Sequence, residues 1–157
     1  MLNEYLQFAS SGYKEKTENF SLTKLIESII KKYENKNISH QLIQDIHMNG
    51  RKSLIQRCIN NLIDNSIKYG NKINIQLSSN NNILVLTIDD DGPGIPPNEY
   101  DNVFKPFYKI NKSRGDSKSS VGLGLSIASD IVRSHGGNII LDKSPLDGLR
   151  VKIIFPS

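Results

Sequence analysis

The sequence has no tryptophan, a single cysteine and no long apolar run, and each absence excludes a class of protein. Cys58, being alone, cannot form an intramolecular disulfide, and a cysteine-based zinc site is equally unsupported. No apolar stretch approaches the roughly 20 residues needed to cross a bilayer, and the N-terminus lacks a signal-peptide pattern. We therefore expect these residues to lie in a reducing compartment, the cytoplasm, without direct membrane contact.

Charge of one sign is also not concentrated enough to indicate a nucleic-acid partner. The net charge is +4, but the basic residues are spread along the chain, without an Arg-rich helix or interleaved aromatic and basic residues. One local cluster lies in a segment with few apolar residues, where a phosphate-bearing ligand would benefit from it. It consists of Lys105, Lys109, Lys112, Arg114 and Lys118.

The chain of 157 residues is the size of one domain and alternates helical and strand patterns. Apolar residues at helical spacing predict helices after Ser21 and after Ser53, each serine acting as an N-cap, and the second helix running to Tyr69. A third helix is expected over 122–135, and 108–121 reads as a long functional loop. Strands are expected at 38–46, 73–77, 84–88, 139–141 and 149–155. This order predicts an α/β sandwich, with one mixed sheet covered by a helical layer.

Two asparagines on the second helix are candidate ligands of a metal ion. Asn61 and Asn65 are four residues apart, so they share one helix face beside the apolar stripe. An amide oxygen is a hard ligand that suits Mg²⁺. Asparagine is abundant in this chain, however, and the pair alone is equally compatible with a solvated surface.

An acidic glycine turn follows the strand that ends at Ile88. In Asp90-Asp91-Gly92-Pro93-Gly94, one carboxylate can accept a hydrogen bond from an exocyclic amine, and the glycines let the backbone approach a flat ring. An EF-hand is excluded because Thr87 occupies its first acidic position and Asn98 its closing glutamate position. An ordinary turn between two strands remains compatible with the motif in isolation.

A glycine loop opens the third helix at Gly122-Leu123-Gly124-Leu125. The free N–H groups and the positive dipole end of such a helix start can hold an anion. The loop is not a Walker loop, because no Gly-Lys-Ser/Thr follows, and a Rossmann loop would need a strand directly before it. Taken alone, this motif is weak.

The motifs together resemble those of a known family in their order and spacing. "NLIDNSIKYG", "DDDGPGIP", "FKPFYK" and "GLGLSIA" are similar to the N, G1, F and G2 boxes of the Bergerat (GHKL) ATP-binding catalytic domain of bacterial sensor histidine kinases, the EnvZ-like type. The resemblance covers nearly the whole chain. It implies a two-layer α/β sandwich with an ATP lid at about 104–121, and the cofactors ATP and Mg²⁺.

The resemblance also implies roles for individual residues. Asn65 is expected to bind Mg²⁺, with Asn61 supporting the phosphates, and Asp90 to recognise the adenine amine. Phe104 and Phe107 are expected to anchor the lid, and Lys109 to reach the phosphates, so that Asn61, Asn65 and Lys109 form the catalytic set. The nucleotide-binding set is completed by Lys68, Tyr69, Gly92, Gly94, Ile95, Gly122, Leu123, Gly124 and Leu125.

The residue at position 61 bears on the reaction. Hydrolases of this fold place a glutamate one turn before the metal-binding asparagine, whereas Asn61 cannot act as a general base. Transfer to a histidine is therefore favoured over hydrolysis. A serine kinase of the anti-sigma-factor type and a degenerate ATP-binding module remain alternatives, and Val121, where a threonine is frequent in the family, favours the second.

The acceptor histidine is expected outside this chain. His40, His47 and His135 lack the sequence context of the family's acceptor, and solvated or capping roles are expected for the last two. Residues 1–15 resemble the end of a dimerisation and phosphoacceptor helix, and 16–157 the catalytic domain. The expected partners are that histidine domain, in a homodimer, and a response regulator receiver domain. The full-length protein is expected to be anchored in the bacterial inner membrane.

Overall fold

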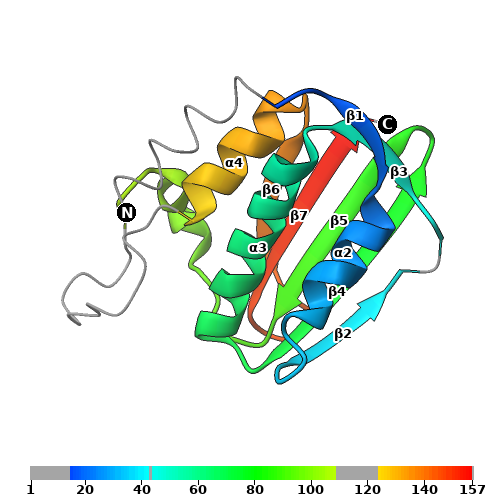
Figure 1. Cartoon of the computed structure of the whole chain (residues 1–157). Coiled ribbons are helices and arrows are strands. Elements are labelled where there is room, and N and C mark those ends of the chain that lie inside the picture. Colours follow the sequence, from blue (N-terminus) through cyan, green and yellow to red (C-terminus); the bar gives the residue numbers. More distant parts are fainter. Residues whose placement is uncertain (1–14, 43, 109–123, 157) are drawn as a thin grey trace.

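The computed structural model describes residues 15–42, 44–108 and 124–156 (Figure 1). The helix expected near the N-terminus, most of the expected lid, Lys109, Gly122 and Leu123 lie outside these ranges. No helix within the described ranges is both long enough and apolar enough to span a bilayer.

Three α-helices are separated along the chain by pairs of consecutive strands in the described ranges. Two short 3₁₀ helices, Pro97–Glu99 and Asn102–Phe104, follow the acidic turn. In chain order the other elements are β1 (Glu18–Ser21), α2 (Leu22–Lys31), β2 (Asn37–Gln41), β3 (His47–Gly50), α3 (Lys52–Tyr69), β4 (Lys72–Asn80), β5 (Ile83–Asp90), α4 (Gly124–Ser134), β6 (Asn138–Lys143) and β7 (Leu149–Pro156).

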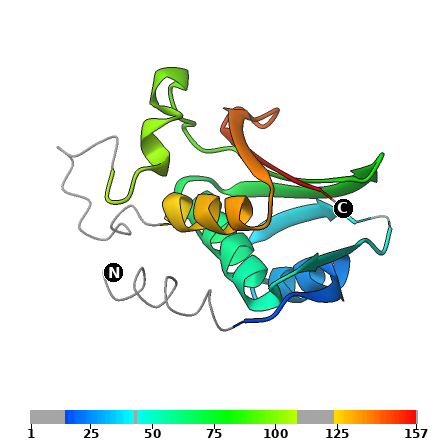
Figure 2. The same cartoon turned by 90° about the horizontal axis from the view of Figure 1, so that it is seen from above.

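Five strands form one mixed sheet in the order β2-β4-β5-β7-β6. Only β2 and β4 are parallel neighbours, and the other three pairs are antiparallel. Helices α2, α3 and α4 lie together on one face of this sheet (Figures 1 and 2). The expected two-layer α/β sandwich is therefore confirmed.

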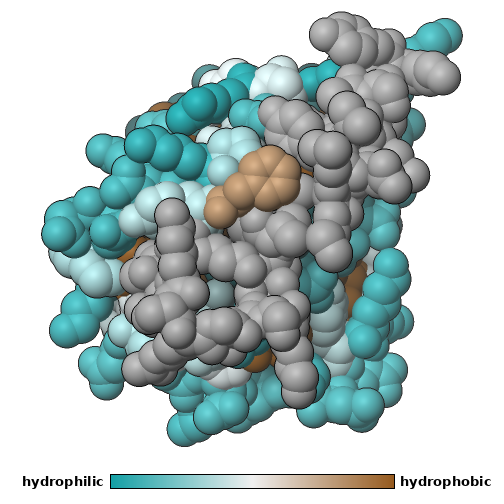
Figure 3. Space-filling view, turned by 90° about the vertical axis from the view of Figure 1, so that its left-hand side faces the viewer, coloured by the Kyte–Doolittle hydropathy of each residue, from teal (hydrophilic) through white to brown (hydrophobic). Residues whose placement is uncertain are grey.

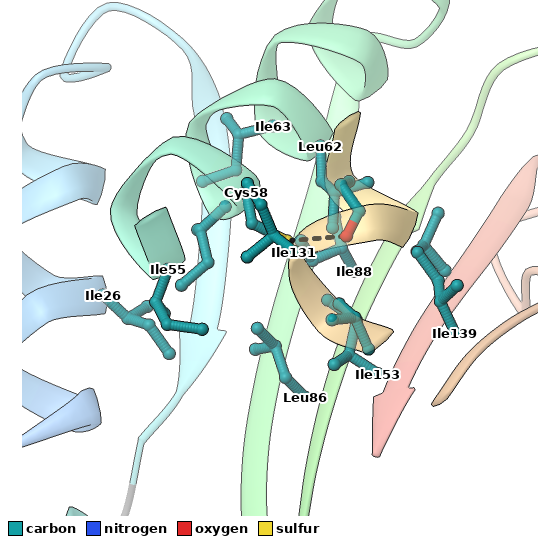
Figure 4. Close-up of a cluster of buried hydrophobic side chains, with 14 of the residues drawn as sticks. Ile26, Ile55, Cys58, Leu62, Ile63, Leu86, Ile88, Ile131, Ile139 and Ile153 are labelled. Atoms are coloured by element: carbon teal, nitrogen blue, oxygen red, sulfur yellow. Dashed lines mark hydrogen bonds between the residues drawn. The ribbon is translucent and has the colours of Figure 1, made fainter. Parts of the chain in front are cut away.

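The core lies between these helices and the sheet. Leu84, Leu86 and Ile88 alternate along β5 and are buried against the helical layer. Between α3 and α4, Cys58 lies in this layer, and its Sγ donates to the carbonyl of Ala128 at 3.7 Å (Figure 4). Complete burial raises the pKa of the Cys58 thiol to about 12, so this cysteine acts as a small apolar side chain.

Two local predictions are wrong. The strand expected over 38–46 ends at Gln41, as β2, and a separate strand, β3, begins only at His47 and pairs with β1 in a two-stranded antiparallel sheet. The helix expected to be capped by Ser53 begins earlier, with Arg51 at the N-cap position and no side-chain bond from it. Both failures concern partners that are distant in sequence, which local patterns do not contain.

The cap of α2 is confirmed, and it gives a test of the fold. Ser21 Oγ accepts the backbone N–H of Lys24 at 3.1 Å and also donates to Asp45. We expect Ser21→Ala to lower the free energy of unfolding by about 1 kcal/mol, measured by urea denaturation. Ser28→Ala is the matched control, because its hydroxyl only bonds back to the carbonyl of Leu25 within the same helix, and its effect should stay within about 0.5 kcal/mol. Equal losses for the two variants would contradict the capping role.

Candidate functional site

The end of α3 lies against the acidic glycine turn. A Cβ added to Gly70 would lie 3.1 Å from the Cβ of Asp90, and one added to Gly92 only 2.6 Å from the carbonyl oxygen of Tyr69. A side chain at position 92 would therefore push the turn away from the end of α3, whereas one at position 70 would be in tight contact with Asp90. The fold thus brings the asparagine helix and the acidic turn, which are separate in sequence, into direct contact.

Asp90 is buried in this contact and held by backbone N–H groups. Its Oδ1 accepts from Gly92 at 2.9 Å and from Leu149 at 3.1 Å, while its backbone carbonyl accepts from Gly148 at 3.1 Å. Among the described residues, these bonds to the carboxylate all end on Oδ1. The second oxygen, Oδ2, is therefore the atom with which Asp90 can accept a hydrogen bond from a ligand.

The environment of Asp90 opposes its ionisation. Burial raises the pKa of the carboxyl, the N–H groups of Leu149 and Gly92 act to lower it, and the charges of Asp91 and Asp89 raise it further, with a net upward shift. A carboxyl with a raised pKa in a backbone-lined site is a candidate functional group.

The three consecutive aspartates have three different environments. Asp89 points to the opposite face of the sheet from Asp90 and binds Arg150 through two hydrogen bonds, at 2.8 Å from Nε and 2.9 Å from Nη2. Asp91 Oδ1 accepts the N–H groups of Asn71 and Lys72 at 2.6 and 2.9 Å, which lower its pKa. Asp90 is thus the one of the three that faces the helical layer.

Gly148 lies against Asp90, a contact that the sequence alone does not predict. A Cβ at this position would lie 2.2 Å from Asp90 Oδ1 and 2.4 Å from the Asp90 carbonyl oxygen. The turn between β6 and β7 must therefore carry glycine here for Asp90 to keep its position. The sequence shows an Asp-Gly turn, but it contains no sign that this turn lies against the distant Asp90.

The two asparagines of α3 lie at the edge of the buried stripe, as predicted. Asn61 and Asn65 are both half-buried, next to the fully buried Leu62 and Ser66. The Nδ2 atom of Asn61 is buried and has no hydrogen-bond partner among the described residues. An unpaired buried amide is costly, so this atom fits a site that a polar ligand or an ordered water completes.

The other candidate nucleotide-binding residues differ in how far they are exposed. Lys68 and Tyr69 are exposed at the end of α3, with Lys68 Nζ 5.2 Å from the centroid of the Tyr69 ring. Ile95 and Phe104 are partly buried against the core, whereas Phe107 is 52% exposed at a positive φ of 66°. The surface on the side of α4 and the 3₁₀ helices is mostly hydrophilic where it is described (Figure 3).

The glycine loop is described only from Gly124, where α4 begins. A Cβ added to Gly124 would meet no atom within 4 Å, so this side of the residue faces open space among the described residues. Leu125 is buried against the core.

The histidines have the solvated and capping roles expected for them. His47 is exposed and lies 3.2 Å from Asp45. Nε2 of His135 accepts the backbone N–H of Arg51 at 3.0 Å, which assigns its proton to Nδ1, and Nδ1 donates to the carbonyl of Ile131 at 2.7 Å. Burial lowers the pKa of His135, consistent with a neutral ring.

The contrast between Asp90 and Asp91 gives a test by carboxyl carbon NMR, assigned with Asp90→Asn and Asp91→Asn. Asp90 should titrate above the ordinary aspartate range and Asp91 below it. Protonation of the two carboxylates changes the free energy of unfolding in opposite directions. The contribution of Asp91 is present above its unfolded pKa and lost as the pH falls through its folded pKa, whereas protonation of Asp90 removes a buried charge and favours the folded state. Titration of Asp90 at or below the ordinary range would contradict the account of its burial.

The part of the chain that is similar to known proteins includes α3, the acidic turn and the β6–β7 turn. The model of the family described as histidine kinase-, DNA gyrase B- and HSP90-like ATPases matches residues 50–157. Sensor histidine kinase GtrS of Pseudomonas aeruginosa is 38% identical over 107 residues, which are 68% of this chain and 22% of GtrS. Sensor histidine kinase WalK of Bacillus subtilis is 27% identical over 99% of this chain and 28% of WalK.

A solved structure confirms the fold. The mycobacterial sensor histidine kinase MprB superposes with a TM-score of 0.76 at 24% identity, over 90% of this chain and 97% of that one. This chain spans about a quarter of the length of the sequence relatives, 22% of GtrS and 28% of WalK. The chain belongs to the family of histidine kinase-, DNA gyrase B- and HSP90-like ATPases, as an ATP-binding catalytic domain of the sensor histidine kinase type.

Proposed function

We propose that this domain binds Mg·ATP and donates the γ-phosphate to a histidine on a separate dimerisation and phosphoacceptor domain. The observation that carries the proposal is the buried Asp90, which is fixed by bonds to Oδ1 and keeps Oδ2 for a ligand. A carboxylate oxygen held in this way suits the 6-amino group of adenine. Gly92, Gly94 and Ile95, which follow on the same turn, would line the place of the ring.

The phosphates would extend from this base pocket along α3 toward Asn61 and Asn65. Asn65 offers an amide oxygen to Mg²⁺, and the unpaired Nδ2 of Asn61 can donate to a phosphate oxygen or a metal-bound water. When bound, Mg²⁺ would neutralise phosphate charge. Lys68 and Tyr69, at the end of the same helix, would contact the nucleotide, and Phe104, Phe107, Lys109 and Gly122 to Leu125 would form and anchor the lid.

Transfer rather than hydrolysis follows from the residues of α3. Asn61 has no basic group that could activate water, so the domain itself lacks that means of hydrolysis. In the transfer, a histidine nitrogen forms a bond to the γ-phosphorus while the bond to the β–γ bridging oxygen breaks and ADP leaves. Positioning and charge neutralisation supply most of the catalysis in such reactions.

The proposed partners lie outside the described residues. GtrS and WalK are named as sensor histidine kinases and are about four times as long as their matched segments. We infer a phosphoacceptor domain that pairs with a second copy, a response regulator that receives the phosphate, and an anchor in the inner membrane for the full-length protein.

Isothermal titration with a nonhydrolysable ATP analogue tests the assigned role of Asn65. We expect Asn65→Ala to weaken binding in the presence of Mg²⁺ by about tenfold or more, the loss expected for one charge-assisted contact. The weakening should largely disappear in EDTA, because only the metal-bound form uses the amide. Asn80→Ala, an exposed asparagine at the end of β4, is the control.

Three outcomes separate the competing functions. No binding by the unsubstituted domain would contradict the nucleotide site, and full binding by Asn65→Ala would contradict the metal role of that residue. Normal binding without acid-labile phosphate on a supplied dimerisation domain would favour a non-enzymatic ATP-binding module.

The glycine of the β6–β7 turn gives an independent test of the base pocket. Gly148→Ala should displace Asp90, because the new Cβ would overlap both its side chain and its backbone. We expect nucleotide binding to fall below detection by titration calorimetry, together with a loss of stability of about 1–3 kcal/mol. Lys143→Ala, exposed just before the same turn, should keep both properties. Retained binding in a folded Gly148→Ala variant would disprove the positioning of Asp90 by this turn.

A further inference from the structure

The start of α3 is capped by a residue from a distant part of the chain. Arg51, at the N-cap position, forms no side-chain cap bond, and the first turn of α3 has no acidic residue. Glu15 supplies the cap instead. Its Oε2 accepts the N–H of Ser53 at 2.7 Å, and its Oε1 accepts that of Leu54 at 3.3 Å. One carboxylate thus satisfies two of the free N–H groups at the positive end of the helix.

The cap is an ionised carboxylate at neutral pH. Partial burial acts to raise the pKa of Glu15, but the bonds from Ser53 and Leu54 and the charge of Arg51 outweigh it, so the pKa is lowered. Glu15 therefore binds α3 as an anion, the form that a helix N-terminus stabilises most.

Residues at the C-terminal end of α4 also bind the N-cap residue of α3, Arg51. The His135 ring accepts the N–H of Arg51 at 3.0 Å, and Arg51 Nη2 donates to Ser134 Oγ at 2.7 Å. Gly50 allows this approach, since a Cβ there would lie 2.9 Å from the His135 ring. We call this set the three-way junction: Glu15, Arg51, Ser53, Leu54, Ser134 and His135.

The junction connects the elements on which the proposed transfer depends. α3 carries Asn61 and Asn65 further along the same rigid helix, and α4 begins at Gly124 in the glycine loop. Glu15 precedes β1, whose pairing with β3 fixes the chain from Glu18 onward. The side chain of Glu15 therefore extends the fixed part of the chain upstream of that strand, toward the side on which the proposed function would place the phosphoacceptor domain.

We propose that Glu15 is a positioning residue of the transfer reaction: by binding the start of α3, it fixes the direction in which the upstream chain leaves the domain relative to Asn61 and Asn65. The inference rests on the proposed function, because this direction matters only if the acceptor histidine is attached upstream. The competing explanation is that Glu15 is a helix cap and nothing more.

A second substitution separates these two explanations. Glu15→Ala removes both the cap and the attachment. Arg51→Asn in the same protein places a favourable N-cap side chain on α3 itself, which restores the cap without the attachment. Arg51→Asn alone controls for loss of the bond to Ser134. Glu18→Ala is the matched control, because Glu18 is an exposed glutamate three residues further along the chain.

The attachment is measured without nucleotide, by the distance between spin labels on Lys16→Cys and Lys143→Cys, both exposed positions of the described chain. Cys58 is buried and should remain unlabelled. We expect the distance distribution to broaden in Glu15→Ala and in Glu15→Ala with Arg51→Asn, and to stay unchanged in Glu18→Ala. Amide exchange at Ser53 and Leu54 should be about fivefold faster in Glu15→Ala, as for loss of a helix cap, and should recover with Arg51→Asn.

Transfer is then measured with a dimerisation and phosphoacceptor domain joined ahead of residue 1. We expect Glu15→Ala with Arg51→Asn to bind the Mg·ATP analogue normally but to transfer phosphate at least about tenfold more slowly, the loss expected for a misplaced reactant. Full recovery of transfer by Arg51→Asn, or an unchanged distance distribution in Glu15→Ala, would overturn the proposal. Absence of transfer in the unsubstituted protein would instead refute the proposed function, while leaving the distance measurements intact.

Discussion

The contact between Asp90 and the β6–β7 turn is the interaction on which the candidate site depends. Two backbone N–H groups, of Gly92 and Leu149, bind one oxygen of a buried carboxylate, and Gly148 approaches so closely that no side chain fits. On the other side, Gly70 and Gly92 let the end of α3 reach the same residue. Strand β5 thus meets β7 and α3 at one charged group, and the position of that group is set by backbone atoms rather than by flexible side chains.

The ion pair on the opposite face of the sheet supports the same contact. Arg150 faces Asp89 across β5 and β7, one residue away from the Leu149 N–H that binds Asp90. The two hydrogen bonds between Arg150 and Asp89 hold β7 in register with β5 next to Leu149, whose N–H binds Asp90. Because Asp89 is almost completely buried, loss of Arg150 would leave an uncompensated charge beside Asp90 and oppose its ionisation further.

The sequence predicts the layers of this fold well because they depend on local periodicity. The apolar stripe of α3, the alternation along β5 and the Asn81-Asn82 turn, where both residues have positive φ, each follow from neighbouring residues. Asp90 lies at the end of a strand and the asparagine pair lies on a helix, as the same local patterns predict. Gly148, the Glu15 cap and the pairing of β1 with β3 could not be predicted, since each joins residues that the chain brings together only after folding.

The two edge strands of the five-stranded sheet, β2 and β6, have features that discourage the addition of a further strand. β2 is five residues long with mostly polar, exposed side chains, and β6 ends in Asp142 and Lys143. Short or charged edge strands commonly protect proteins against edge-to-edge pairing of sheets from two molecules. In the proposed homodimer, a second copy of the domain would be present at high local concentration, where an unprotected apolar edge strand would promote aggregation. The polar β2 and the charged end of β6 would allow such crowding without pairing between the edge strands of two sheets, even though Ile140 of β6 is 40% exposed.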